Sequence, residues 1–210
     1  MYGSNSKNYG DGFTTMYGAD HEDIAYSYRT GNHGDGSWYS INGNIDYQRT
    51  SRKNKQRMIT FSYKINTQPQ TSNSNTGYED IHAKEEVDDL VKRLLLKNSQ
   101  SDGKTNTMEQ TFQVDYTTPI GELHTVEAGA KYIFRRNTSD NKLYEAAGGS
   151  DDYLYNEDRS SDYRHLNHIL AAYLGYTLKY KDFTFKPGVR YEQTVQRVKY
   201  IVGPGENFHT

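Results

Sequence analysis

The stretch from Thr105 to Arg136 constrains the fold most strongly, because apolar and polar side chains alternate along it at every second residue. In its first half Phe112 and Val114 fall on one side of the backbone, and Asp115 falls on the other. Residues two apart share a face of a β-strand, so this alternation predicts a strand with one apolar and one charged face. That arrangement suits a barrel that faces lipid outside and water inside.

A turn signal divides this stretch into two strands. The sequence Pro119-Ile120-Gly121 predicts a tight hairpin turn that pairs residues 111–116 with residues 126–131. Each strand is about a dozen residues long, whereas strands of soluble proteins usually have about 5–6. The hairpin therefore predicts strands long enough to cross a bilayer at a tilt.

Similar alternation elsewhere predicts an all-β fold, an antiparallel up-and-down meander that forms part of a transmembrane β-barrel. The six predicted strands cover residues 37–49, 57–67, 106–118, 123–136, 164–180 and 183–200. Pro187 has no backbone N–H to give to a neighbouring strand, so we expect it at a bulge or an unpaired position. The whole chain, residues 1–210, is expected to be a fragment of a single barrel domain.

The connections between these strands alternate between short and long. We expect short turns at 50–56, 119–121 and 181–182, and long polar loops at 68–104 and 137–162. Residues 1–36 are expected to form an exposed loop, and residues 201–210 the start of another. Apolar residues at helical spacing predict one short helix at 83–97, inside the first long extracellular loop. Short turns on one side and long loops on the other are the arrangement of outer-membrane barrels.

The alternation also assigns side chains to the two faces of the expected barrel. The residues expected to face lipid are apolar or aromatic: Tyr39, Ile41, Tyr47, Phe61, Phe112, Val114, Val126, Tyr132, Leu170, Leu174 and Tyr191. The residues expected to face the lumen are charged: Asp115, Glu127, Lys131, Arg135, Arg190 and Glu192. Such lumen charges have two possible roles. They contact a plug or a solute, or they pair across strands and keep the inner wall solvated, and of these two roles cross-strand pairing is the one we expect for most of them.

The composition fits a lipid-facing sheet better than a soluble core. Only 33% of the residues are hydrophobic, and the mean hydropathy is −1.00. The chain nevertheless has 20 Tyr and 7 Phe, which disordered chains lack and which membrane barrels use in their aromatic belts. The net charge of −2 implies no general affinity for nucleic acid. The absence of cysteine excludes disulfides, thiolate metal sites and cysteine nucleophiles.

The start of the chain leads us to expect that it is a piece of a longer protein. Met1 is followed by polar residues, without the basic and apolar regions of a secretory signal peptide. The longest mostly apolar run, Ile169–Leu178, is far shorter than the ~20 residues of a transmembrane helix. A secreted barrel needs a signal, so we expect one to precede this segment in the full protein.

Three blocks of the sequence resemble the outer-membrane β-barrel family of Bacteroidetes TonB-dependent receptors. They are Asn42–Arg49, Thr111–Arg136, and Ile169–Tyr200 with its Gly203-Pro204-Gly205 tail. The likeness extends over most of residues 37–207 and rests on strand–turn blocks, without a catalytic motif. It implies a barrel of about 22 strands, filled by an N-terminal plug, that imports a solute across the outer membrane. It also implies outer-membrane lipid, the plug domain, TonB and a surface lipoprotein as partners, and no nucleic acid.

No catalytic or metal-binding pattern stands out. The chain lacks the G-x-x-x-x-G-K-[ST], G-x-S-x-G and H-E-x-x-H motifs, so we expect no enzymatic activity, no cofactor and no metal. His165 and His168 are expected on opposite faces of a strand, which argues against a shared metal ion. The acids at 151–152 and 157–158 have the carboxylate chemistry that Ca²⁺ requires, but they lack EF-hand spacing and are expected to form a solvated loop.

Two other functions stay open on the sequence alone. One is an outer-membrane barrel with an anchoring or assembly role and no transport. The other is a soluble β-sandwich that binds glycans through exposed tyrosines, which predicts shorter strands and more even turn spacing. A sandwich would also cover one face of its sheet with a second sheet, so the structure distinguishes it from a barrel.

Overall fold

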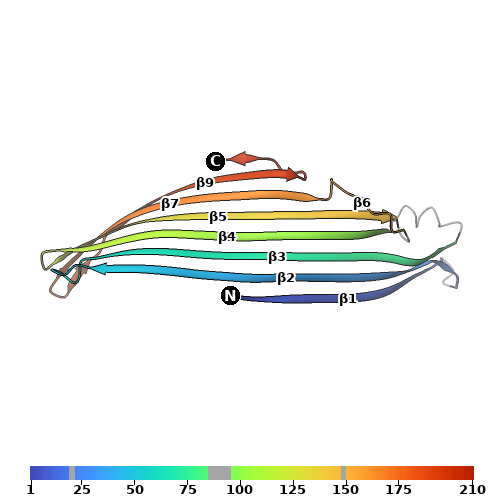
Figure 1. Ribbon diagram of the computed structural model, residues 1–210, viewed down its shortest axis with the longest axis horizontal. Helices are drawn as coiled ribbons and strands as arrows, with labels where there is room; N and C mark the ends of the chain where they lie inside the picture. Colours follow the sequence, from blue (N-terminus) through green and yellow to red (C-terminus); the bar gives the residue numbers. More distant parts are fainter. Residues whose placement is uncertain (19–21, 85–95, 148–149) are drawn as a thin grey trace.

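The computed structural model describes residues 1–18, 22–84, 96–147 and 150–210, and its strands form a single sheet (Figure 1). The long strands are β1 (Tyr2–Tyr17), β2 (Ile24–Thr50), β3 (Met58–Ala83), β4 (Lys97–Ile120), β5 (His124–Ala147), β7 (Ser161–Tyr180) and β9 (Gly188–Val202). The short strands are β6 (Leu154–Tyr155), β8 (Phe183–Phe185) and β10 (Phe208–His209). All pairings are antiparallel, as the alternation predicts.

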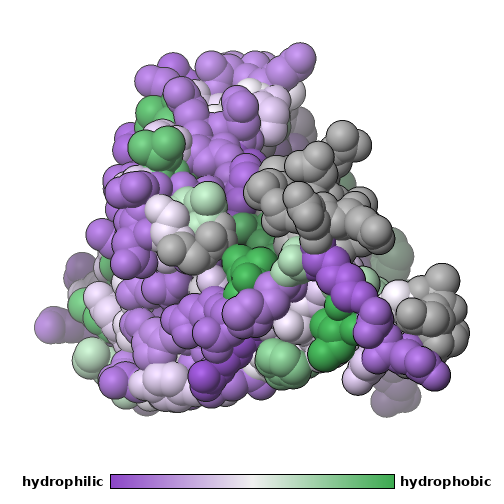
Figure 2. Space-filling view, turned by 90° about the vertical axis from the view of Figure 1, so that its right-hand side faces the viewer, coloured by the Kyte–Doolittle hydropathy of each residue, from purple (hydrophilic) through white to green (hydrophobic). Residues whose placement is uncertain are grey.

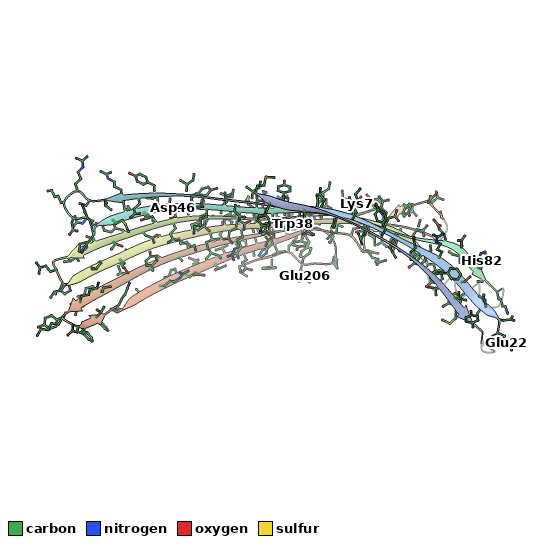
Figure 3. The ribbon with its side chains drawn as sticks, turned by 90° about the horizontal axis from the view of Figure 1, so that it is seen from below. Lys7, Glu22, Trp38, Asp46, His82 and Glu206 are labelled. Atoms are coloured by element: carbon green, nitrogen blue, oxygen red, sulfur yellow. The ribbon has the colours of Figure 1, made fainter. Side chains whose placement is uncertain are left out.

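The strands follow one another across the sheet in sequence order. The order is β1-β2-β3-β4-β5-β7-β9-β10, with β6 paired to β5 and β8 paired to β7. The predicted up-and-down meander is therefore confirmed. The chain begins at one edge of the sheet with β1 and ends at the opposite edge with β10 (Figure 1). Figure 3 shows that the strands bend along their length, so the sheet is an arched wall.

The β4–β5 hairpin forms as predicted, with a small shift in register. Val114 pairs with Ala130, so residues 111–116 lie opposite residues 128–133 and not opposite 126–131. The turn consists of residues 121–123, because Gly121 adopts a left-handed backbone conformation, with φ of 70°, that suits glycine. Faces repeat with a period of two, so this two-residue shift leaves every side chain on its predicted face.

The other two short connections also lie where the alternation places them. Residues 51–57 connect β2 to β3, and a two-residue turn at 181–182 connects β7 to β8. Pro187 lies between β8 and β9 and outside both strands, as its missing N–H predicts. Its carbonyl oxygen still accepts a hydrogen bond from the Tyr176 amide at 3.0 Å, which keeps β9 aligned with β7.

The loops predicted at 1–36, 68–104 and 137–162 are wrong, because most of these residues belong to strands. β1 pairs with the first part of β2, and β10 lies within the loop expected at 201–210. β3 and β4 have 26 and 24 residues, well beyond the ~9–11 that cross a bilayer. The missed segments are rich in Ser, Asn, Asp and Gly, which have weak β-propensity, and backbone hydrogen bonds to their neighbours hold them in the sheet.

The helix predicted at 83–97 falls mostly on residues 85–95, which lie outside the described residues. Its two end residues belong to strands, Ala83 to β3 and Lys97 to β4, so the predicted boundaries are wrong. In the ranges that the structure describes, no helix has the length and apolar character needed to span a membrane.

The sheet has no conventional hydrophobic core. Among the described residues, the buried hydrophobic side chains are Ala146, Ala171 and Val198 alone. Large apolar side chains lie in the open instead, with Ile45 71% exposed and Val189 70% exposed. All described strands belong to one sheet, with no second sheet on either face, so the soluble β-sandwich is wrong. A sheet that exposes such a surface requires an apolar environment.

Candidate functional site: the two faces of the sheet

The residues expected to face lipid gather on one side of the sheet, here called the apolar face. Directly paired residues share a side, and the pairs Tyr47–Phe61, Phe61–Val114 and Val114–Ala130 connect four strands. Alternation along each strand places the other members on the same side. The predicted members of this face are Tyr39, Ile41, Tyr47, Phe61, Phe112, Val114, Val126, Tyr132, Leu170, Leu174 and Tyr191.

Aromatic side chains form a ladder across the apolar face. The ring centroids of Tyr63 and Phe112 lie 4.8 Å apart, and those of Phe112 and Tyr132 lie 6.4 Å apart. These rings and Leu170 surround a shallow hollow of about 480 Å³. Each cross-strand aromatic pair stabilises the sheet by about 0.2–1 kcal/mol. These pairs supply packing between neighbouring strands, because the described structure has no second sheet to pack against.

The boundary of the apolar face crosses the sheet obliquely. On β2 this face ends at Tyr47, and Ala172 lies in the same hydrogen-bonded row on β7. On β7 it continues farther toward the short turns, through Leu178 to Tyr180, whose partners on β8 are Phe185 and Phe183. The apolar face therefore ends at different levels on β2 and β7, as a membrane boundary does across the tilted strands of an outer-membrane barrel.

The opposite side, here called the polar face, carries the charges expected to line the lumen. Arg135 on β5 lies directly opposite Glu109 on β4, with Arg135 Nε 2.5 Å from Glu109 Oε2. Lys186 Nζ lies 3.1 Å from Glu127 Oε2. These pairs are partly exposed, so each contributes only about 0–1 kcal/mol to stability. Their main consequence is a wall whose charges are solvated and mutually compensated.

The remaining predicted lumen residues also lie on the polar face. Arg190 and Glu192 form a 2.6 Å ion pair along β9. Lys131 borders a hollow of about 620 Å³, together with Lys64 and Asp46. This hollow offers both a carboxylate and ammonium groups, so it suits a polar solute or water better than an apolar ligand.

Tyr173 and Gly129 form a contact on the polar face that the sequence analysis missed. They are direct partners on β7 and β5, and a Cβ placed on Gly129 would clash with the Tyr173 ring. The Tyr173 hydroxyl donates a hydrogen bond to Asp115, which also accepts one from Gln113 at 2.8 Å. The sequence shows only a glycine and an aromatic residue at inward positions of neighbouring strands, and the register of the structure brings them opposite each other.

Glu145 anchors the connection between β5 and β7, well beyond the apolar face. Its side chain is only 8% exposed and accepts hydrogen bonds from Asn156 at 2.5 Å, from Lys97 at 3.4 Å and from Arg159. The Asn156 hydrogen bond, assisted by the two cations and opposed by burial, lowers the pKa of this carboxyl below its usual value. The sequence suggested a solvated loop here, so this buried acid was not foreseen.

No metal centre is present in the part of the chain that the structure describes. It contains no group of three or more His, Cys, Asp or Glu side chains placed to hold a metal ion. His168 lies on the apolar face, with Nδ1 2.7 Å from the Tyr132 hydroxyl, and His165 lies on the polar face. The acids at 151–152 and 157–158 are exposed, as a solvated loop predicts.

The end of the sheet opposite the short turns is rich in polar side chains. Figure 2 looks onto this end, and hydrophilic residues dominate the view. On the same side as the apolar face, Asp35 pairs directly with Lys7 on β1 and with Asn73 on β3. Asn73 Nδ2 donates a hydrogen bond to Asp35 Oδ2 at 3.2 Å. These polar pairs suit water on the side that carries the apolar face farther along the strands.

Comparison with known proteins identifies the family. A search of the curated proteins gave no match. Among solved structures, the crystal structure of the ferric citrate transporter FecA in the unliganded form is similar to 94% of this chain, at 12% identity and a TM-score of 0.34. The chain covers 36% of that transporter, and so distant a likeness supports no conclusion. Residues 48–208, more than half of the chain, match the outer membrane protein β-barrel family. The chain therefore belongs to this family, and its place is the outer membrane.

Proposed function

We propose that this chain forms part of the wall of an outer-membrane transporter that imports a solute. The observation that carries the proposal is the opposite chemistry of the two faces. The apolar face is open among the described residues, which suits lipid as its solvent. The polar face carries charges of both signs, which suits a water-filled lumen.

The number of strands favours a wide barrel. The main path of the sheet contains eight strands, and β1 and β10 lie at its opposite edges without pairing to each other in the described structure. A closed barrel of about 8 strands has an interior that side chains fill, whereas ~16–22 strands leave a channel or hold a plug. A barrel that includes this open sheet therefore has room for a solute path.

The resemblance to Bacteroidetes TonB-dependent receptors extends the proposal to an energised importer. Its partners are an N-terminal plug domain in the lumen, TonB as the energy source, and a surface lipoprotein at the extracellular end. The polar ends of β3 and β4, which extend beyond the apolar face, offer a surface for that lipoprotein. The proposal involves no catalytic step and no cofactor.

A barrel without transport is the second candidate. The observation that favours it is the pairing of charges on the polar face, because Glu109 engages Arg135 and Arg190 engages Glu192. Charges that compensate each other are less available to a solute. Lys131 and Lys64, which border the same hollow, form no ion pair within 4 Å in the described ranges, so they are charges that an importer has available for a solute.

Depletion of solutes from the medium distinguishes the two candidates. Cells with and without the gene are grown in a defined medium, and the small molecules that disappear are compared by mass spectrometry. The comparison is repeated with a protonophore that collapses the energy source. A solute that disappears only with the protein, and only in energised cells, supports the importer. Depletion that survives the protonophore indicates a passive channel, and no protein-dependent depletion supports the barrel without transport.

Two neighbouring cysteine variants test the solute path itself. The chain has no cysteine, so a single introduced thiol can be labelled without background. Lys131→Cys places the thiol on the polar face, and Ala130→Cys places it one residue away on the apolar face. A bulky water-soluble maleimide should reduce uptake by the Lys131→Cys variant and leave the Ala130→Cys variant unchanged. Equal effects on both variants would contradict a path along the polar face.

A further inference from the structure

Four cations gather on the apolar side of the sheet, just beyond the edge of the apolar face that lies farther from the short turns. They are Arg136 on β5, Arg164 on β7, and Arg197 and Lys199 on β9, here called the basic cluster. Leu166 pairs with both Arg136 and Arg197, and Arg164 pairs with Lys199, so the four lie in two adjacent rows. All four side chains are exposed.

The basic cluster directly borders the apolar face. On each of its strands, the next residue on the same side toward the short turns is apolar or aromatic: Phe134 on β5, Leu166 on β7 and Val195 on β9. Residues two apart on a strand are separated by about 6.6 Å. A lipid whose chains cover these apolar residues therefore has its headgroup at the level of the four cations.

The cations of the basic cluster lack carboxylate partners within 4 Å in the described part of the chain. Two acids on the same side, Asp140 and Asp162, pair with each other one row farther from the apolar face. Asp140 lies 3.9 Å from Lys142, which is farther still from the apolar face. Like charges on neighbouring strands repel one another, so the cluster favours an anion that compensates them.

The basic cluster occupies only one sector of the sheet. In the same two rows, β2, β3 and β4 carry uncharged side chains: Tyr39, Ile41, Thr67, Pro69, Asn106 and Met108. A general belt of charge would continue across these strands. The concentration of four cations on three neighbouring strands therefore indicates a local binding site.

We propose that the basic cluster binds the phosphate of a lipid headgroup in the leaflet that covers the adjoining part of the apolar face. Guanidinium groups bind phosphate oxygens through paired N–H···O hydrogen bonds, and three of the four cations are arginines. Cations at a membrane surface attract anionic lipids in the same way. This inference rests on the proposed lipid contact of the apolar face, and it adds the class of lipid that is held there.

The test replaces all four cations, in the variant Arg136→Gln, Arg164→Gln, Arg197→Gln and Lys199→Gln. The barrel that includes this chain is inserted into phosphatidylcholine vesicles with and without a minor fraction of phosphatidic acid, whose headgroup is a phosphate monoester. Phosphatidic acid that stays bound after mild extraction is counted by native mass spectrometry. Retention at low ionic strength should fall roughly fivefold for each cation removed, and salt should weaken retention by the wild type.

A second quadruple variant removes the same charge from the same side of the sheet, farther from the apolar face. Its substitutions are Lys7→Gln, Arg29→Gln, Lys104→Gln and Lys142→Gln, and each of these cations lies directly opposite an acid on a neighbouring strand. This control should retain phosphatidic acid as the wild type does. Equal retention by the basic-cluster variant and the wild type, or equal loss in both variants, would overturn the proposal. Failure of the wild type to insert into either kind of vesicle would instead overturn the lipid contact of the apolar face.

Discussion

Ala130→Arg tests the lipid contact of the apolar face with little other disturbance. Ala130 lies midway between Val126 and Phe134 on β5 and borders the shallow hollow, so a longer side chain has room. Near the mid-plane of a bilayer, an arginine on the lipid side of a barrel costs ~2–4 kcal/mol. The ratio of folded to unfolded protein in the membrane should therefore fall by roughly 30- to 700-fold.

The measurement is reversible urea unfolding in phospholipid vesicles, with the free energy of unfolding as the result. Ser62→Arg is the matched control, because Ser62 lies on the polar face at a similar height and directly opposite Asp46. It adds the same charge on the water side and should change the free energy of unfolding by no more than about 0.5 kcal/mol. Equal losses in the two variants, or no loss in Ala130→Arg, would refute the assignment of the apolar face to lipid.

Three further outcomes follow from the contacts described above. Gly129→Val should destabilise the sheet by about 1–3 kcal/mol because its side chain meets the Tyr173 ring, and Tyr173→Ala should relieve part of this loss. Strict additivity of the two substitutions in unfolding experiments would contradict the contact. The contacts that lower the pKa of Glu145 also stabilise the β5–β7 connection. This stabilisation is fully present at a pH above the ordinary pKa of 4.5, and it is lost as the pH falls through the lower pKa of the folded state. The protection of the Leu143 amide against hydrogen exchange, measured relative to its intrinsic exchange rate at each pH, should therefore fall in acid because this amide donates to Ser160 Oγ, and Glu145→Gln should show a weaker dependence on pH. The isolated chain should require detergent, because residues such as Ile45 and Tyr191 are exposed, and a monodisperse monomer in plain buffer on size-exclusion chromatography would contradict this.

The sequence predicts the part of the sheet that carries the apolar face, because lipid on one side and water on the other impose a strict alternation. Phe112, Val114 and Asp115 show the alternation most clearly, and the structure places Phe112 and Val114 on one side of the sheet and Asp115 on the other. The hairpin register differs by two residues because the turn begins at Gly121 and not at Pro119. An error of this size leaves the faces intact, whereas a shift of one residue would exchange them.

The polar ends of the strands could not be predicted in the same way. Where Asp35 lies beside Asn73, both faces meet water, so the sequence shows no period of two and looks like a loop. Their place in the sheet depends on backbone pairing with a neighbouring strand, which leaves little trace in the side chains. The Gly129–Tyr173 contact depends on register between β5 and β7, which the sequence of either strand alone does not specify.

Cysteine scanning along β4 measures whether neighbouring residues of one strand face opposite environments, lipid on one side of the sheet and water on the other. Single cysteines at each position from 112 to 116 are introduced into this cysteine-free chain and exposed to a membrane-impermeant maleimide in outer-membrane vesicles. We expect a period of two, with thiols at 113 and 115 reactive from the water side and thiols at 112, 114 and 116 protected by lipid. Uniform reactivity along the strand, or the reverse alternation, would contradict it.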